Sequence, residues 1–191
     1  MGWLDNPPTA HYSQAVTLLQ KLGALDEMSR ITAHGSAIMK LGVHPRLGHM
    51  MLRGSELGYG VLACELAALL GERDPLRGTQ RVDADIVLRL EVLRECGESQ
   101  NVDRRRLKQI RITVMQWRRQ LHCAASPEDN RDLMLAGVLL AYAYPDRIAQ
   151  RRNRMHNRFI LSNGRGACIK DGDPLVASNY IVAAHLDDGH E

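Results

Sequence analysis

The sequence predicts a mainly helical protein that ends in a small antiparallel β element. Only 4% of its 191 residues are aromatic, so the core must be aliphatic, whereas strands favour β-branched and aromatic residues. Apolar residues recur at helical spacing through most of the first 145 residues. After Arg158 the apolar runs become short and flank an Asn163-Gly164 pair, which is typical of a hairpin turn.

The first 42 residues predict two short helices. The first spans His11–Leu22, and Gly23 is placed to end it as a C′ residue. Thr32 is an N-cap candidate for a second helix that reaches Leu41. A segment of strand length, Ser29–Thr32, lies between them, and the pattern fits the second half of a winged-helix domain.

Five further helices are expected, at Pro45–Leu57, Tyr59–Leu70, Asp83–Cys96, Asp103–Leu121 and Leu133–Pro145. The second and the last are apolar on nearly every side. A helix without a polar face needs burial on all sides, so we expect both at the centre of the bundle. Asp83 is the expected N-cap of the third of these helices.

The helix Asp103–Leu121 has two distinct stripes. Its apolar stripe consists of Leu107, Ile110, Val114, Trp117 and Leu121. The opposite side is cationic, with Arg104, Lys108, Arg111 and Arg118. Seven basic residues and no acid lie between Arg104 and Arg119, so ion pairs within the helix cannot neutralise them.

A second basic segment follows Asp146. Up to Gly166 its charged residues are all basic, namely Arg147, Arg151, Arg152, Arg154, Arg158 and Arg165. Residues 103–170 hold 15 Lys/Arg against 5 Asp/Glu, although the whole chain carries only +3. Such an asymmetry suggests an anionic partner. The alternative is a solvated charged face, which two separate basic segments with few acids disfavour.

Three short strands are expected, at Phe159–Leu161, Ala167–Ile169 and Tyr180–Leu186. Asn163-Gly164 predicts a type I′ turn, in which both central residues need positive φ. Three strands are few for a closed β domain. We therefore expect an incomplete β module and a chain that is a fragment.

The sequence contains no recognisable catalytic or metal motif. It has no Gly-Lys pair, and hence no phosphate-binding loop, and no GxSxG or HExxH. The four widely spaced cysteines predict reduced thiols in a cytoplasmic protein. The longest uncharged apolar run, Leu133–Pro145, is too short to span a membrane. Trp117 and Tyr144 could stack on bases, but both lie on apolar stripes, which favours core packing.

Several stretches resemble the DEAH/RHA helicase family. LGALDEMSRITAHGSAIMKLGVHPRLGHMML is similar to the junction between its winged-helix and helical domains. AYPDRIAQRR, RFILSNGRGACI and LLGERDPLRG closely resemble its bacterial HrpB branch. The resemblance covers essentially the whole chain. One departure is Gly42, where the family usually has proline.

The resemblance implies three parts. Residues 1–42 correspond to the end of the winged helix, 43–145 to a ratchet-type helical bundle, and 146–191 to the start of the C-terminal β-rich region, with YPDRIAQRR as the hinge. ATP and magnesium belong to two RecA-like motor domains that this chain lacks, so no ATP-binding residue is carried over. The chain alone is not expected to be an enzyme or to hold a cofactor or metal.

The expected function is that of a non-catalytic accessory region of an ATP-dependent helicase. It would bind single-stranded nucleic acid, RNA or DNA, and couple to the motor domains of the same polypeptide, with no membrane partner. The expected contacts are Arg104, Lys108, Arg111, Arg118, Arg147, Arg151, Arg152, Arg154, Arg158 and Arg165. The alternative is a helical protein-interaction module whose basic faces dock on acidic partner or motor surfaces.

Overall fold

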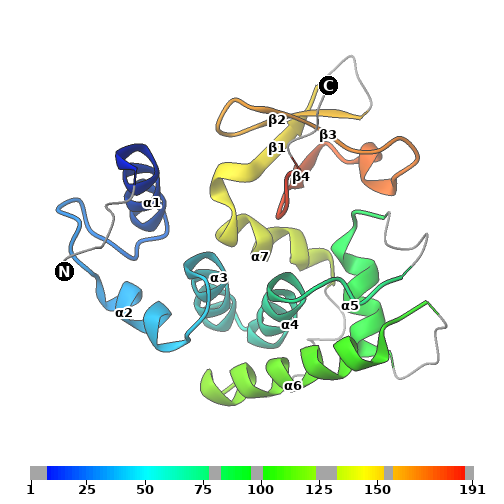
Figure 1. Cartoon of the computed structure of the whole chain (residues 1–191), viewed down its shortest axis with the longest axis horizontal. Coiled ribbons are helices and arrows are strands. Elements are labelled where there is room, and N and C mark those ends of the chain that lie inside the picture. The colour runs from blue at the N-terminus through cyan, green and yellow to red at the C-terminus, as the bar shows by residue number, and fades with distance from the viewer. Residues whose placement is uncertain (1–7, 78–82, 96–100, 124–132, 153–156, 188–191) are drawn as a thin grey trace.

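The structure, a computed structural model, describes residues 8–77, 83–95, 101–123, 133–152 and 157–187. A layer of helices lies below a small sheet, and the N-terminal helices stand to one side (Figure 1). The helices are α1 (Thr9–Lys21), α2 (Ala33–Lys40), α3 (Pro45–Glu56), α4 (Gly60–Gly71), α5 (Ile86–Arg94), α6 (Arg104–Gln120) and α7 (Ala136–Ala143). The strands are β1 (Ile148–Arg151), β2 (Arg158–Leu161), β3 (Gly166–Cys168) and β4 (Tyr180–Val182). The predicted mainly helical fold with a small antiparallel sheet is confirmed.

The N-terminal pair, α1 and α2, follows the predicted local signals. Gly23 takes a left-handed φ of +67° just after α1. The Thr32 side chain accepts a hydrogen bond from the Gly35 amide at 2.9 Å and caps α2. The expected strand-length segment between them forms only one isolated bridge, Leu25 to Ile31, because no neighbouring strand in the described chain offers a ladder to join.

The central helix of the bundle is α4. All its residues from Gly60 to Leu69 are buried, and it contacts α3, α5, α6 and α7. Its one charged side chain, Glu65, accepts two hydrogen bonds from Arg94 of α5, at 2.7 and 2.9 Å. A buried carboxylate needs such a partner, so this pair fixes α5 against the centre of the bundle.

The expectation that Leu133–Pro145 forms one fully buried helix is wrong. Leu133–Leu135 is a 3-10 turn, and only the eight residues of α7 are α-helical. Met134 is 87% exposed and Val138 49% exposed. The helix packs on α3 and α4 below and on β4 at its end, so one side of it is left uncovered.

The N-cap of α5 is Asp85 instead of Asp83. The Asp85 carboxylate accepts a hydrogen bond from the Val87 amide at 3.0 Å. Arg89 donates to the main-chain carbonyls of Asp83 and Asp85. These bonds involve residues 83–85 outside the helix, so the cap lies two residues later than the sequence predicts, and the helix ends at Arg94.

The sheet has the order β3-β2-β1-β4 with every pair antiparallel. The strand β1 lies inside the segment predicted as a basic hinge. It was not predicted, because IAQR lacks a clear apolar alternation. The hairpin between β2 and β3 forms as predicted. Its turn is not type I′, because Gly164, at φ +85°, is left-handed while Asn163 is not.

The inner face of the sheet has its own small core. Ala149, Phe159 and Leu161 are buried there, and Ile181 and Ala167 pack against them. The register places these side chains on one face, because Ala149 pairs with both Leu161 and Ile181, and Phe159 pairs with Ala167. The sheet is therefore a separate unit of packing beside the helical core.

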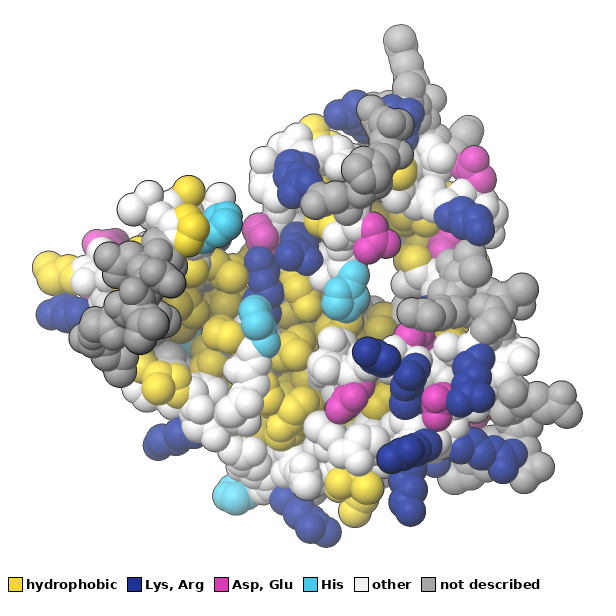
Figure 2. Space-filling view, viewed as in Figure 1, with side chains coloured by type: hydrophobic (Ala, Val, Ile, Leu, Met, Phe, Trp, Pro, Cys, Tyr) yellow, Lys and Arg dark blue, Asp and Glu magenta, His cyan; other side chains and the backbone are white. Residues whose placement is uncertain are grey.

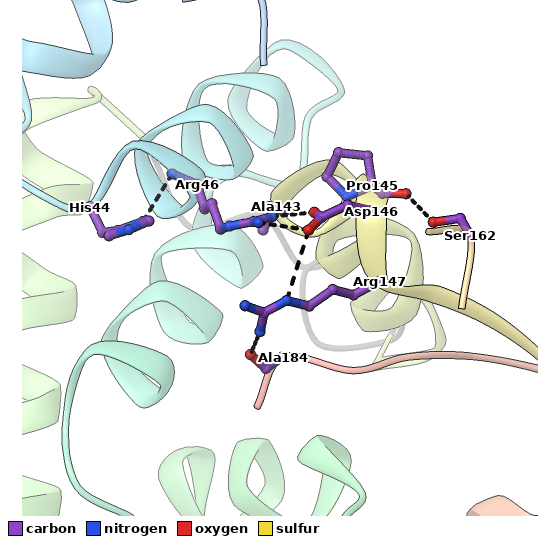
Figure 3. A network of polar contacts seen from close by, with 8 residues as sticks. All are labelled: His44, Arg46, Ala143, Pro145, Asp146, Arg147, Ser162 and Ala184. Atoms are coloured by element: carbon purple, nitrogen blue, oxygen red, sulfur yellow. Dashed lines mark hydrogen bonds and ion pairs between the residues drawn. The ribbon is translucent and has the colours of Figure 1, made fainter. Parts of the chain in front are cut away.

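An ion pair between buried Arg46 and half-buried Asp146 joins the sheet to the bundle (Figure 3). Arg46 of α3 contacts both carboxylate oxygens of Asp146 at 2.5 and 2.9 Å and donates to the Ala143 carbonyl at 2.9 Å. Next to it, Arg147 donates to the carbonyl of Ala184 at 2.7 Å. The network thus connects α3, the end of α7 and the chain after β4, so YPDRIAQRR is anchored at its start and continues as a strand.

Candidate nucleic-acid interface

The basic residues form two groups that the fold keeps apart. The helix α6 runs along one side of the molecule and the strands lie on the other, with α3, α4 and α7 between them (Figure 1). Figure 2 shows Lys and Arg side chains gathered in two areas, one over α5 and α6 and one over the sheet. The structure does not bring the predicted cations into one continuous surface.

On α6 the predicted cations have different environments. Arg111 donates three hydrogen bonds to carbonyls at the end of α5, two to Leu93 and one to Glu95, at 2.7–3.0 Å. It therefore ties the C-terminal end of α5 to α6. Arg118 is half-buried, whereas Arg104 and Lys108 are exposed.

The exposed side of α6 also carries apolar residues that the sequence reasoning missed. Ile112 is 40% exposed and Met115 is 52% exposed. They lie between Lys108 and Arg119, and the four residues, at i, i+4, i+7 and i+11, share one helix face. This spacing was visible in the sequence, but the stronger apolar stripe of Leu107 and its neighbours obscured it. We call Lys108, Ile112, Met115 and Arg119 the α6 stripe.

In the C-terminal group two predicted cations are bound to the protein itself. Arg147 donates to Ala184, and its guanidinium lies 5.3 Å from the centre of the Tyr144 ring. Arg151 donates to the Val176 carbonyl at 3.2 Å and to the Asn179 side chain at 2.9 Å. Both arginines hold the segment after β3 in place, and Arg154 lies outside the described residues.

The remaining predicted cations of this group, Arg152, Arg158 and Arg165, are exposed. Arg165 lies at the hairpin, where its amide donates to the Asn163 side chain at 3.0 Å. The Arg152 amide donates to the Arg158 carbonyl at 2.9 Å, which extends the β1–β2 ladder by one residue. Trp117 and Tyr144, the candidate stacking aromatics, pack in the helical core as expected.

A histidine pair couples the N-terminal helices to the bundle. His34 of α2 and His49 of α3 share a hydrogen bond of 2.8 Å between their ring nitrogens. Burial, the adjacent His34 and the cation Arg53 lower the pKa of His49 to about 4, although Glu56 opposes them. Burial also lowers the pKa of His34, so the pair is neutral near pH 7.

This pair predicts a pH-dependent stability. The unfolded chain binds a proton at His49 near pH 6.5 and the folded chain only near pH 4. The neutral His49 therefore contributes its full share of the free energy of unfolding above pH 6.5. This contribution is lost as the pH falls from 6.5 to about 4. For a partly solvated site we expect a loss of about 1–2 kcal/mol between pH 7 and 4, measured by urea unfolding. His49→Gln should flatten this slope between pH 7 and 5, and parallel slopes for the two proteins would contradict the assignment.

Comparison with known proteins matches nearly the whole chain. The ATP-dependent RNA helicase HrpB of Escherichia coli K12 is 31% identical over 189 residues, 99% of this chain. Crystal structures described as the E. coli DExH-box NTPase HrpB and the DEAH/RHA helicase HrpB superpose with TM-scores of 0.78 and 0.71, at 28% identity. The chain is homologous to a segment of HrpB.

The HrpB match is partial on the side of the relative. This chain spans 20% of the curated E. coli HrpB and covers 21% and 20% of the two crystallised chains. A mouse protein named as the probable ATP-dependent RNA helicase DHX34 is 29% identical over 83 residues, 44% of this chain and 7% of its own length. No family model matches.

The described part of this HrpB-like chain shows neither a membrane span nor a metal cluster. None of its described helices is both long and apolar enough to cross a membrane. Among the same residues, no three His, Cys, Asp or Glu side chains gather in a way that could hold a metal ion. Cys64, Cys123 and Cys168 are free thiols, and burial raises the pKa of Cys64 to about 12. That thiol is therefore protonated and unreactive.

Proposed function

We propose that this chain is a non-catalytic accessory region of an ATP-dependent DEAH-type helicase in the cytoplasm. It contributes to single-stranded nucleic-acid binding and couples to RecA-like motor domains that bind ATP and magnesium. Homology along 99% of the chain supports the helicase part of this proposal. The observation that supports strand binding is the exposed pair Arg152 and Arg158, to which no ion-pair partner is assigned among the described residues.

The same proposal assigns a role to each part of the chain. Residues 1–42 form the end of a winged helix, 43–145 a ratchet-type bundle, and 146–191 the start of the C-terminal β region. In support, α1 has no buried residue, which suits a helix whose partners lie elsewhere in a domain. The helices α3, α4, α6 and α7 share one core, which suits a bundle that moves as one body.

Strand binding predicts a salt-dependent affinity that depends on the pair on the sheet. Phosphate contacts release counterions, with a slope of about −0.7 per contact for single strands. The variant Arg152→Gln/Arg158→Gln should therefore bind a single-stranded oligonucleotide more weakly and reduce the slope of log K against log[salt] by about 1.4. Fluorescence anisotropy across a salt series measures both effects.

The matched control removes two exposed cations from the N-terminal helices. Lys21→Gln/Lys40→Gln changes the net charge equally, yet both lysines lie on α1 and α2, away from the sheet. It should lower affinity only through the small change in overall charge. Equal losses in the two variants would show that the binding depends on net charge and not on the pair. Absence of salt-dependent binding by the unmodified chain would refute strand binding itself.

The alternative function is a helical protein-interaction module. The α6 stripe favours it, because exposed Ile112 and Met115 suit an apolar groove with an acidic rim better than a phosphate backbone. In this case the basic faces dock on acidic motor or partner surfaces and touch no nucleic acid. Titration with isolated motor domains distinguishes the two functions, since tight docking together with negligible strand binding supports the alternative.

A further inference from the structure

The outer face of the sheet presents its side chains in two rows. Gln150 pairs with Ile160 and with Tyr180, and Ile160 pairs with Gly166, so the first row crosses all four strands. Towards its other end, the same face packs on the helical core through Val182. The first row itself stands clear of the bundle, because Gln150, Tyr180 and Gly166 are exposed and Ile160 is 39% exposed.

The second row contains like charges side by side. The β1–β2 register, extended by the bond from the Arg152 amide to the Arg158 carbonyl, sets these two arginines directly opposite each other. Cross-strand neighbours of this kind have Cβ atoms about 5 Å apart, and like charges there are destabilising. None of the four strands contains Asp or Glu. A bound anion would relieve this repulsion.

The first row offers an aromatic side chain beside this anion site. Tyr180 is 64% exposed, although apolar rings are usually covered. The Gln150 amide donates to its hydroxyl at 3.2 Å, so the ring leans over β1 towards the strands that carry the arginines. At the opposite end of the row Gly166 has no side chain, and nothing lies within 4 Å of where a Cβ atom would be. Among the described residues, both ends of the first row are thus exposed.

We propose that this face binds a single nucleic-acid strand as a stacking platform, in which Tyr180 stacks on one base while Arg152 and Arg158 bind the adjoining phosphates. The two rows are two residues apart, about 7 Å along a strand, which is on the scale of one nucleotide. Base stacking on exposed aromatics together with cations along the backbone is how sequence-tolerant single-strand binding works. The inference rests on the proposed strand binding and adds the residue that recognises bases, which the basic residues alone cannot do.

The test compares an intact single-stranded oligonucleotide with an abasic one of the same length, using anisotropy with the full 191-residue chain. The abasic strand keeps the phosphates and lacks the bases. Tyr180→Ala should bind the intact strand about 5- to 10-fold more weakly, the lower part of the range for loss of one stacked base. It should bind the abasic strand as the unmodified chain does, and Tyr180→Phe should keep most of the affinity for the intact strand.

The matched control is Tyr12→Ala, because Tyr12 on α1 is 62% exposed and lies away from the sheet. It should leave both affinities unchanged. Since Tyr180 and Tyr12 are largely exposed, both variants should unfold at the temperature of the unmodified chain, and this is checked by circular dichroism. An oligonucleotide containing 2-aminopurine gives a second signal, because stacking on Tyr180 should change its fluorescence and Tyr180→Ala should abolish that change.

Different results separate this inference from the proposed function. If Tyr180→Ala binds the intact strand normally while Arg152→Gln/Arg158→Gln binds it weakly, strand binding stands and the platform is overturned. If the unmodified chain binds neither strand, both fail. If Tyr180→Ala instead weakens only the docking of isolated motor domains, the face is a protein contact and the platform is overturned.

Discussion

Asp146→Asn is expected to lower the free energy of unfolding by about 3 kcal/mol, as for other buried ion pairs that lose one partner. Arg46 is only 8% exposed, so its charge would remain inside the protein without a carboxylate. Burial alone raises the pKa of Asp146, but the hydrogen bonds and charge of Arg46 outweigh burial and lower it. The pair is therefore ionised in the folded protein, and urea unfolding at neutral pH measures its loss.

The matched control for this pair lies on the surface of the same helix. Arg53 and Glu56 form an ion pair at 2.6 Å, with side chains 46% and 56% exposed. Glu56→Gln should cost less than about 1 kcal/mol, because solvent screens an exposed pair. The double variant Arg46→Met/Asp146→Leu should recover part of the stability lost in Asp146→Asn, since apolar residues of similar size can replace a buried pair. Equal costs for the buried and the exposed carboxylate would contradict the role of the network.

Phe159→Ala is expected to destabilise the sheet by about 3–5 kcal/mol, the usual cost of removing a buried phenylalanine. Phe159 is the single Phe of the chain and is fully buried in one cluster with Ala149 and Leu161. The sheet has few other core residues, so a cavity there cannot be refilled by its neighbours. The small core should then open, and strand binding by the outer face should be lost with it.

Hydrogen exchange distinguishes local from global effects of this change. Protection should fall in β1, β2 and β3 and remain in α3 and α4, because the two cores are separate. Phe159→Leu keeps most of the volume and should cost less than half as much. A uniform loss of protection over sheet and bundle would instead mean that the two cores unfold as one unit.

The helical elements could be predicted from local signals. Thr32, Pro45 and Asp103 begin α2, α3 and α6 as their residue types predict, because capping depends only on neighbours in the chain. The errors lie where a distant contact decides. The Ala84 amide donates a hydrogen bond to the Asp173 carboxylate at 2.8 Å, outside α5, and β1 forms because β2 and β4 offer ladders on both sides.

The candidate site was predicted in part. The arginines of the two basic segments were visible in the sequence. Which of them are exposed and able to bind a ligand was not. Arg111, Arg147 and Arg151 donate hydrogen bonds to main-chain carbonyls of the protein itself. A guanidinium group has five N–H donors and readily pairs with nearby carbonyls. Tyr180 had no signal other than its place at the start of a short apolar run.

The sequence by itself determined the starts of α2, α3 and α6, the hairpin near Gly164, the aliphatic core and the homology to HrpB. These follow from residue type and short-range spacing, which the chain carries wherever it folds. Only the tertiary structure decided which cations face solvent, that Arg152 lies opposite Arg158, and that Tyr180 lies on the same face. Strand register joins residues far apart in sequence, and one residue of slip would turn each of these side chains to the other face.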